Sequence, residues 1–164
     1  MAGTGKTTLS DMLAKKLSIP IIRKDDVVDA FKMIKDEKKE LVDNEVCYNI
    51  LYKIIQTNLD LNVDFIIDTI PANINGAKGF LDRLDFKDNK IFKFFIICSD
   101  GNEWKRRHIE RLKNPLPHEV FKSFDHVVDH YKNFDISPLE NEYVIDTAYA
   151  VEKCFEDIVK IIIN

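Results

Sequence analysis

The chain has 164 residues, of which 45% are hydrophobic and 32% are charged, and its formal net charge is −4 at pH 7. This length predicts a single domain with a hydrophobic core, spanning residues 1–164, and the composition excludes a disordered chain. The acidic balance gives no sign of a nucleic-acid-binding protein, and no apolar run approaches the length of a membrane-spanning helix.

The first eight residues contain the second half of the phosphate-binding pattern G-x-x-x-x-G-K-[ST]. Gly3 and Gly5 would let backbone N–H groups approach phosphate oxygens. Lys6 would reach the β- and γ-phosphates, and the Thr7 hydroxyl would bind Mg²⁺. The first glycine of the pattern would fall immediately before Met1, as would the strand that feeds such a loop. We therefore expect a shortened form of a longer domain, in which the first, central strand is truncated.

A helix is predicted directly after this loop. Helical spacing separates its apolar residues, which are Leu9, Met12, Leu13 and Leu17. The positive N-terminal end of this helix would add to the same anion site. This context favours a true phosphate-binding loop over a chance match, because the tripeptide G-K-T alone is common.

Further along the chain, apolar runs alternate with helical periodicities. The predicted strands are residues 20–23, 63–68, 91–98 and 143–146. One helix is predicted to begin near Val27, and another runs from the cap Asn102 to a stop at Pro115. The remaining predicted helices cover residues 44–59, 80–84, 118–131 and 151–163. Residues 36–40 and 71–79 are predicted as an exposed charged stretch and a loop. This alternation predicts an α/β fold with a parallel sheet, whose ligands bind at the carboxyl ends of the strands.

Polar side chains follow the predicted strands at this edge of the sheet. They are Asp25, Asp26, Asp68, Ser99 and Asp146. Asp68 could bind Mg²⁺ directly or through water, because hard cations prefer carboxylate oxygen. Asp25 or Asp26 could accept the proton of a hydroxyl-bearing substrate. The alternative that these two carboxylates only cap a helix stays open, since a strand–helix junction favours aspartate.

An arginine pair lies on the helix that follows the third predicted strand. Arg107 and Arg111 are four residues apart and share a helical face, whereas Arg106 is expected to point elsewhere into solvent. Two like charges on one helical face repel each other unless an anion neutralises them, so residues 101–117 could form a lid over phosphates. The alternative is ordinary surface charge interleaved with acidic residues of the same helix.

The histidines and cysteines form no metal-binding pattern. The four histidines are scattered at His108, His118, His126 and His130. The three cysteines are far apart, at Cys47, Cys98 and Cys154. We therefore expect no zinc site, and reduced thiols in a cytoplasmic protein without an export signal.

The order of these motifs resembles the small P-loop kinases of the nucleoside and nucleotide kinase superfamily. Within it, the chain is most similar to the group of zeta toxins, chloramphenicol phosphotransferase, adenylylsulfate kinase and the polynucleotide kinase domain. The resemblance is carried by residues 2–9, 24–26, 68–69, 104–107 with Arg111, and 144–147. It implies a P-loop kinase-like three-layer sandwich, with helices on both faces of a five-stranded parallel sheet.

The same resemblance implies ATP as phosphoryl donor, with Mg²⁺. Asp25 would then meet the acceptor hydroxyl, and Arg107 and Arg111 would be lid arginines. The loop at Asp146 and Thr147 would lie beside the adenine. Where the family often has a basic residue shortly after the acceptor-site aspartate, this chain has valines at 27 and 28. This departure favours a neutral or weakly charged acceptor over a nucleotide.

The sequence therefore predicts an ATP-dependent kinase that phosphorylates a hydroxyl of a small molecule and binds neither nucleic acid nor membrane. The predicted catalytic residues are Lys6, Asp25, Arg107 and Arg111. The predicted nucleotide-binding residues are Gly3, Thr4, Gly5, Lys6, Thr7, Thr8, Asp146 and Thr147, and the predicted Mg²⁺ ligands are Thr7 and Asp68. Two alternatives stay open: an ATP-hydrolysing switch that acts on a protein partner, and a truncated inactive remnant.

Overall fold

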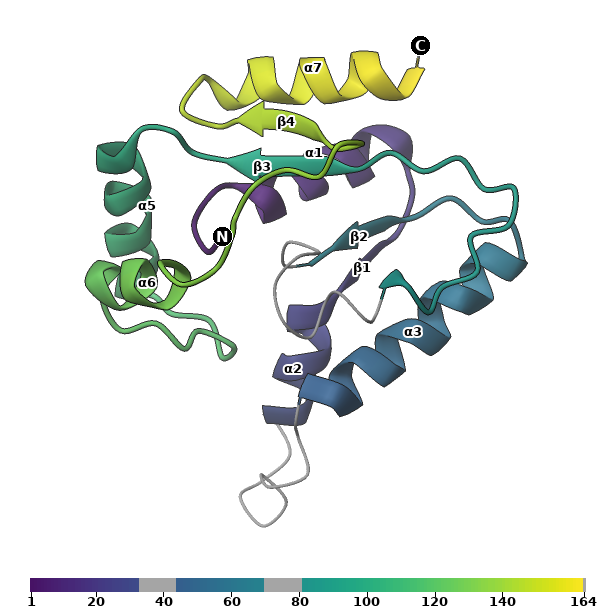
Figure 1. Ribbon diagram of the computed structural model, residues 1–164, viewed down its shortest axis with the longest axis horizontal. Helices are drawn as coiled ribbons and strands as arrows, with labels where there is room; N and C mark the ends of the chain where they lie inside the picture. The colour runs from purple at the N-terminus through teal and green to yellow at the C-terminus, as the bar shows by residue number, and fades with distance from the viewer. Residues whose placement is uncertain (33–43, 70–80, 164) are drawn as a thin grey trace. The chain divides into compact units, whose positions relative to one another are not determined.

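The computed structural model describes residues 1–32, 44–69 and 81–163 (Figure 1). Its elements follow one another as α1 (Lys6–Leu17), β1 (Ile21–Arg23), α2 (Lys24–Lys32), α3 (Asn44–Asp60), β2 (Ile66–Asp68), β3 (Phe94–Ile97), α5 (Gly101–Lys113), α6 (Phe124–Tyr131), β4 (Tyr143–Asp146) and α7 (Val151–Ile163). The chain divides into two compact units. The first unit contains residues 1–18, 91–115 and 119–164, and the second contains residues 19–90 and 116–118.

The first unit is built on the parallel pair β3–β4, in which Phe94 lies opposite Tyr143 and Ile97 opposite Asp146. Helices α1 and α7 pack against each other, and α7 also contacts β4 (Figure 1). The buried residues of the two helices are apolar: Leu9, Leu13, Cys154 and Ile158. This packing holds the start of α1 in the same unit as the carboxyl ends of β3 and β4.

The second unit is built on the parallel pair β1–β2, in which Ile21 lies opposite Ile66 and Arg23 opposite Asp68. Helix α3 contacts both α2 and β1. The core of this unit consists of Tyr48, Leu51, Ile55, Leu59 and Leu84. Four of these residues come from α3 at spacings of three and four, so they form one buried stripe along the helix.

The predicted order of strands and helices is confirmed, with shorter strands and the following corrections. The described strands form two parallel pairs, β1–β2 and β3–β4, whereas the resemblance implied a five-stranded sheet. Helix α2 begins at Lys24 and not near Val27. The cap of α5 is not Asn102 but Asp100, whose side chain accepts hydrogen bonds from the N–H groups of Asn102 and Glu103. Helix α6 begins only at Phe124, because Ser123 caps it there. The segments predicted at 36–40 and 71–79 lie outside the described residues, and the helix predicted at 80–84 ends in a turn at residues 82–83. The single domain over 1–164 stays a prediction.

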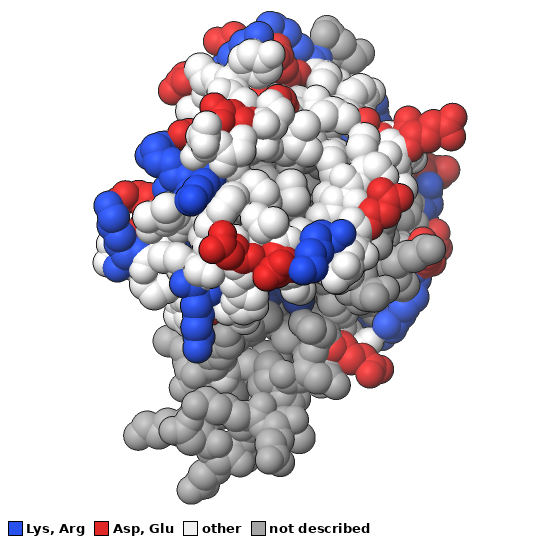
Figure 2. Space-filling view, turned by 60° about the vertical axis from the view of Figure 1, so that its left-hand side comes forward, with Lys and Arg blue, Asp and Glu red and all other residues white. Residues whose placement is uncertain are grey.

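Charged side chains of both signs are interspersed on the face that Figure 2 shows. Among the described residues of that face, no broad field of one sign is visible. None of the helices in the described part of the chain combines the length and the apolar composition that crossing a bilayer requires.

The α3 stripe gives a direct test of the second core. Ile55 is 0% exposed and its neighbour Ile54 is 42% exposed. Replacing a buried isoleucine by alanine removes transfer free energy and leaves a cavity, so Ile55→Ala is expected to lower the free energy of unfolding by about 2–5 kcal/mol. The matched variant Ile54→Ala should change it by less than about 1 kcal/mol. Urea unfolding of both variants checks this, and equal losses would contradict the assigned core.

Candidate functional site

The loop before α1 has the backbone conformation of an anion-binding turn. Gly3 and Gly5 have φ angles of +77° and +91°, in the left-handed region that glycine adopts without strain. Gly5 is the N-cap of α1 and has no side chain, so it offers no capping side-chain oxygen to the first N–H groups of the helix. The helix dipole favours negative charge at this position.

Polar contacts fix this loop from within and from α5. The Lys6 ammonium donates to the Met1 carbonyl at 2.8 Å, and the hydroxyl of the buried Thr4 donates to the same carbonyl at 3.1 Å. The indole N–H of Trp104 in α5 donates to the Ala2 carbonyl at 2.7 Å. The loop is thus held in shape before any ligand contact, which reduces the ordering cost of binding.

Thr147, directly after β4, links the loop to the sheet and to α5. Its hydroxyl lies 2.8 Å from the Thr4 carbonyl and 2.9 Å from the Ile97 carbonyl, and donates its one hydrogen to either. The same oxygen accepts a hydrogen bond from Nη1 of Arg107 at 2.9 Å. A Cβ atom on Gly5 would lie 3.4 Å from the Thr147 methyl group, which is an ordinary van der Waals contact, so the positive φ angle rather than the available space favours glycine here.

Asp146 has both carboxylate oxygens engaged within the first unit. One accepts from the backbone N–H groups of Ser99 and Ala148, each at 3.0 Å, and the other accepts from the Ser99 hydroxyl. Burial alone would raise the pKa of Asp146, but these hydrogen bonds outweigh it and hold the pKa below its usual range. The carboxylate therefore fixes the β4–α7 turn that carries Thr147.

The arginines of α5 are paired with carboxylates. Glu103 accepts from Arg106 at 2.6 Å and from Arg107 at 2.8 Å, and these hydrogen bonds lower the pKa of Glu103 to about 2. Arg107 also donates to the Thr147 carbonyl at 2.7 Å. Arg111 forms an ion pair with Glu119, whose side chain is 4% exposed. Acidic groups of the chain itself thus balance the charges of Arg107 and Arg111, whose mutual repulsion the sequence predicted.

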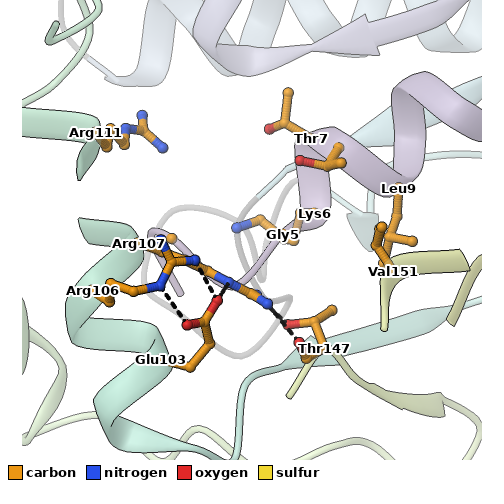
Figure 3. Close-up of a pocket in the computed structure, with 12 residues that line it drawn as sticks. Gly5, Lys6, Thr7, Leu9, Glu103, Arg106, Arg107, Arg111, Thr147 and Val151 are labelled. Carbon is orange, nitrogen blue, oxygen red and sulfur yellow. Dashed lines mark hydrogen bonds and ion pairs between the residues drawn. The ribbon is translucent and has the colours of Figure 1, made fainter. Parts of the chain in front are cut away.

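A cleft of about 430 Å³ lies between the start of α1 and the arginine side of α5 (Figure 3). Its lining residues are Gly3, Gly5, Lys6, Thr7, Thr8, Leu9, Glu103, Arg106, Arg107, Arg111, Thr147 and Val151. Four cationic side chains therefore face one carboxylate, next to a helix N-terminus. A cleft with this charge balance fits a ligand with several negative charges, such as a polyphosphate.

The same cleft fits Mg²⁺ only as a partner of a phosphate ligand. The Thr7 side chain, in the first turn of α1, lines it. Among the described residues, no group of three or more His, Cys, Asp or Glu side chains is placed to hold a metal ion. Because Mg²⁺ retains waters and commonly binds substrate phosphates, Thr7 together with phosphate oxygens and water would form a suitable site.

The first unit thus brings together most of the predicted nucleotide site. Thr4 is buried behind the loop rather than in the cleft wall, and Asp146 supports the wall through Thr147. Arg106 is solvated as expected, with a side chain that is 66% exposed, but it also lines the cleft and pairs with Glu103, which the sequence did not predict. Sequence reasoning did not identify Glu103 as a site residue. The sequence did contain a signal for this pairing, because Glu103 lies three residues before Arg106 and four before Arg107 in the predicted helix.

The two remaining predicted residues belong to the second unit. Asp68, the predicted Mg²⁺ ligand at the end of β2, lies 3.6 Å from Nε of Arg23. The side chain of Asp25, in the first turn of α2, is 54% exposed and lies 3.5 Å from Nε2 of His118. His118 also contacts Asp29, one turn further along α2, at 2.8 Å. The histidine is a neighbour that sequence spacing did not indicate, because it lies 89 residues from Asp29.

A family model described as an AAA domain matches residues 1–130 of the chain. The chain belongs to this AAA domain family. Among solved structures, it is similar to a crystal structure from Chloroflexus aurantiacus J-10-fl described as a "putative kinase". The two chains are 20% identical, the match covers 97% of this chain and 92% of the other, and the TM-score is 0.63. A comparison with curated proteins finds no match. The structural likeness confirms the predicted α/β P-loop kinase-like fold with parallel strands.

The Asp146 turn makes a pH-dependent prediction. Asp146→Asn should lower the free energy of unfolding at pH 7 by about 1 kcal/mol, because an amide oxygen accepts these hydrogen bonds less strongly than a carboxylate does. A carboxylate whose pKa is lowered in the folded state stabilises fully above its unfolded pKa of about 4 and loses this effect as the pH falls through the folded value. Thermal unfolding should therefore show that the difference in stability between the wild type and Asp146→Asn becomes smaller as the pH is lowered from 7 to 3. Glu156→Gln, an exposed change on α7, is the control. A pH-independent difference for Asp146→Asn would contradict the assignment.

Proposed function

We propose that this protein is an ATP-dependent phosphotransferase that transfers the γ-phosphate, with Mg²⁺, to a hydroxyl of a small molecule. The observation that carries the proposal is the cationic cleft at the N-terminus of α1, lined by Lys6 and three arginines of α5. Phosphoryl transfer is catalysed mainly by positioning and by charge stabilisation, and this cleft offers the groups for both. The P-loop kinase-like fold supports the same reaction class.

Each group of the cleft has a role in this proposal. The loop amides and Lys6 hold the phosphates, Thr7 holds Mg²⁺ against them, and the turn after β4 receives the adenine. Arg107 and Arg111 neutralise the charge that develops during transfer. Both are now paired with Glu103 and Glu119, so ATP phosphates would compete with these carboxylates for the guanidinium groups.

Asp25 is the proposed acceptor-site base. Its exposed carboxylate at the start of α2 is open to a hydroxyl-bearing ligand, and Asp26 beside it is the alternative. The valines at 27 and 28 add no positive charge there, which supports a neutral or weakly charged acceptor. In this proposal, Asp68 assists Mg²⁺ through water, in competition with Arg23.

A second candidate is an ATP-hydrolysing module that acts on a protein partner, for which the same cleft would bind the nucleotide phosphates. The two candidates differ in what stimulates turnover. A kinase transfers phosphate to an added hydroxyl compound and depends on the acceptor-site carboxylate. A hydrolytic module releases inorganic phosphate and depends on its protein partner instead.

Nucleotide binding is tested first by thermal unfolding with Mg·ATP. ATP that binds only the folded chain should stabilise it by about 2.7 kcal/mol at a hundredfold excess over the dissociation constant. Lys6→Ala should remove this shift, because it removes the cation that pairs with the β- and γ-phosphates. Lys16→Ala changes an exposed lysine in the last turn of the same helix and should leave the shift intact. A full shift in Lys6→Ala would exclude the proposed cleft.

Transfer is tested with γ-labelled ATP and a panel of neutral hydroxyl compounds, including polyols, sugars and nucleosides. Asp25→Asn should reduce transfer about 100-fold or more while sparing the Mg·ATP thermal shift, because general base catalysis is lost and phosphate binding is not. Asp26→Asn, at the adjacent exposed position, is the matched control and should retain transfer. The reverse pattern would assign the base to Asp26. Undiminished transfer in both variants would refute a carboxylate base at this end of α2.

A further inference from the structure

Helix α5 lines the cleft with two consecutive arginines, which are held in different ways (Figure 3). Arg107 donates hydrogen bonds to Glu103 and to both the hydroxyl and the carbonyl of Thr147. Within the described part of the chain, Arg106 donates hydrogen bonds only to Glu103, from Nε at 2.6 Å and from Nη2 at 2.7 Å. A ligand that binds Arg106 therefore replaces one carboxylate, whereas a ligand that displaces Arg107 would also remove support from the Thr147 turn.

The Arg106 pair also costs less to separate than the ion pair of Arg111 in the same cleft. The Arg106 side chain is 66% exposed and that of Glu103 is 26% exposed, so both groups regain water when they separate. Glu119, the partner of Arg111, is 4% exposed and also accepts a hydrogen bond from the backbone N–H of Phe121 at 3.2 Å. Separating Arg111 from Glu119 would leave a buried carboxylate without its cation, which is strongly unfavourable.

Glu103 presents Arg106 with a chemical partner that resembles a phosphate. Among the described residues that line the cleft, Glu103 is the single carboxylate. Its two oxygens accept from Nε and Nη2 of Arg106 in the bidentate arrangement that a phosphate group also forms with a guanidinium. A polyphosphate carries more negative charge than one carboxylate, and Lys6 lines the same cleft as a second cation for it. A polyphosphate can therefore replace Glu103 on Arg106 with a net gain.

We propose that Arg106 is a further phosphate-binding residue of this cleft, and that Glu103 is the carboxylate that a polyphosphate ligand replaces on it. The inference rests on the proposed function and deepens it, because it names the residue that sets how much negative charge a ligand must bring. Without a ligand, Glu103 holds Arg106 at the cleft. When a polyphosphate binds, the Glu103 side chain turns into solvent, while Arg107 keeps its contacts with Thr147.

Helix α5 also carries a matched ion pair that does not line the cleft. Lys113 pairs with Glu110 at 2.6 Å with the same spacing of three residues, and both side chains are 61% exposed. An exposed pair of this kind contributes little to stability by itself. If Glu103 and Arg106 formed only another surface pair, removing either partner would leave the affinity for an anionic ligand unchanged. The two pairs therefore allow a direct comparison on one helix.

The first test measures the affinity of the full chain for inorganic tripolyphosphate by isothermal titration calorimetry. Arg106→Gln should weaken binding about tenfold, because charge-assisted hydrogen bonds to the phosphate are lost. Glu103→Gln should tighten binding about fivefold or more, because the ligand no longer has to displace a carboxylate. Lys113→Gln and Glu110→Gln make the same charge changes outside the cleft lining and should alter the affinity by less than about twofold.

The double variant Glu103→Gln/Arg106→Gln separates the exchange from a general effect of charge. In the proposed exchange, the gain from Glu103→Gln acts through Arg106, so it should be lost when Arg106 is also replaced. A gain that persists in the double variant would overturn the inference, as would weaker or unchanged binding in Glu103→Gln or unchanged binding in Arg106→Gln. The proposed function fails separately, if the wild type does not bind tripolyphosphate or if Lys6→Ala leaves its binding intact.

A second measurement follows the Glu103 carboxyl group itself. Hydrogen bonds from Arg106 and Arg107 lower the pKa of Glu103 to about 2, so its carboxyl carbon should not titrate between pH 4 and pH 7 in the free protein. Release into solvent should return this pKa toward its ordinary value of about 4.3. Carbon-13 NMR with tripolyphosphate bound should then show titration in the lower part of this range. A Glu103 signal that does not titrate in the complex would overturn the exchange.

Discussion

The candidate site depends on one hydrogen-bonded connection, the contact of Thr147 with the Thr4 carbonyl. It ties the loop before α1 to the end of β4, and Arg107 binds the same hydroxyl from α5. A glycine-rich loop costs more backbone entropy to order than other segments, so it keeps an anion-binding shape only when other parts of the fold hold it. Thr147 and Trp104 supply that support, and the cleft is formed where their contacts converge.

Electrostatic balance is the second organising feature. A cluster of four cationic side chains around a small cleft would repel itself without counter-charges. Glu103 and Glu119 supply these charges, each by direct pairing with an α5 arginine. In the proposed function, the same pairing would select among ligands, because a ligand must offer enough negative charge to replace a carboxylate on a guanidinium. A polyphosphate would meet this requirement, whereas a singly charged anion would gain little from the exchange.

The second unit has a different polar chemistry. Its core is the apolar stripe of α3, and its reactive groups lie at the start of α2, where Asp25 is exposed and His118 is nearly buried. The exposed carboxylate of Asp25 can meet a ligand, and His118 contacts both Asp25 and Asp29 of the same helix.

The sequence by itself determined the order of strands and helices, the phosphate-binding loop and the face shared by the α5 arginines, because periodicity and motif spacing act over a few residues. It could not determine which partners those side chains have. The contacts of Thr147 with Thr4, Trp104 with Ala2 and His118 with Asp29 span 143, 102 and 89 residues. Only the tertiary structure showed that Arg106 lines the cleft, that Arg111 pairs with Glu119 and that His118 lies beside Asp25. The physical reason is that partners so far apart in the sequence are brought together by packing, which no local pattern encodes.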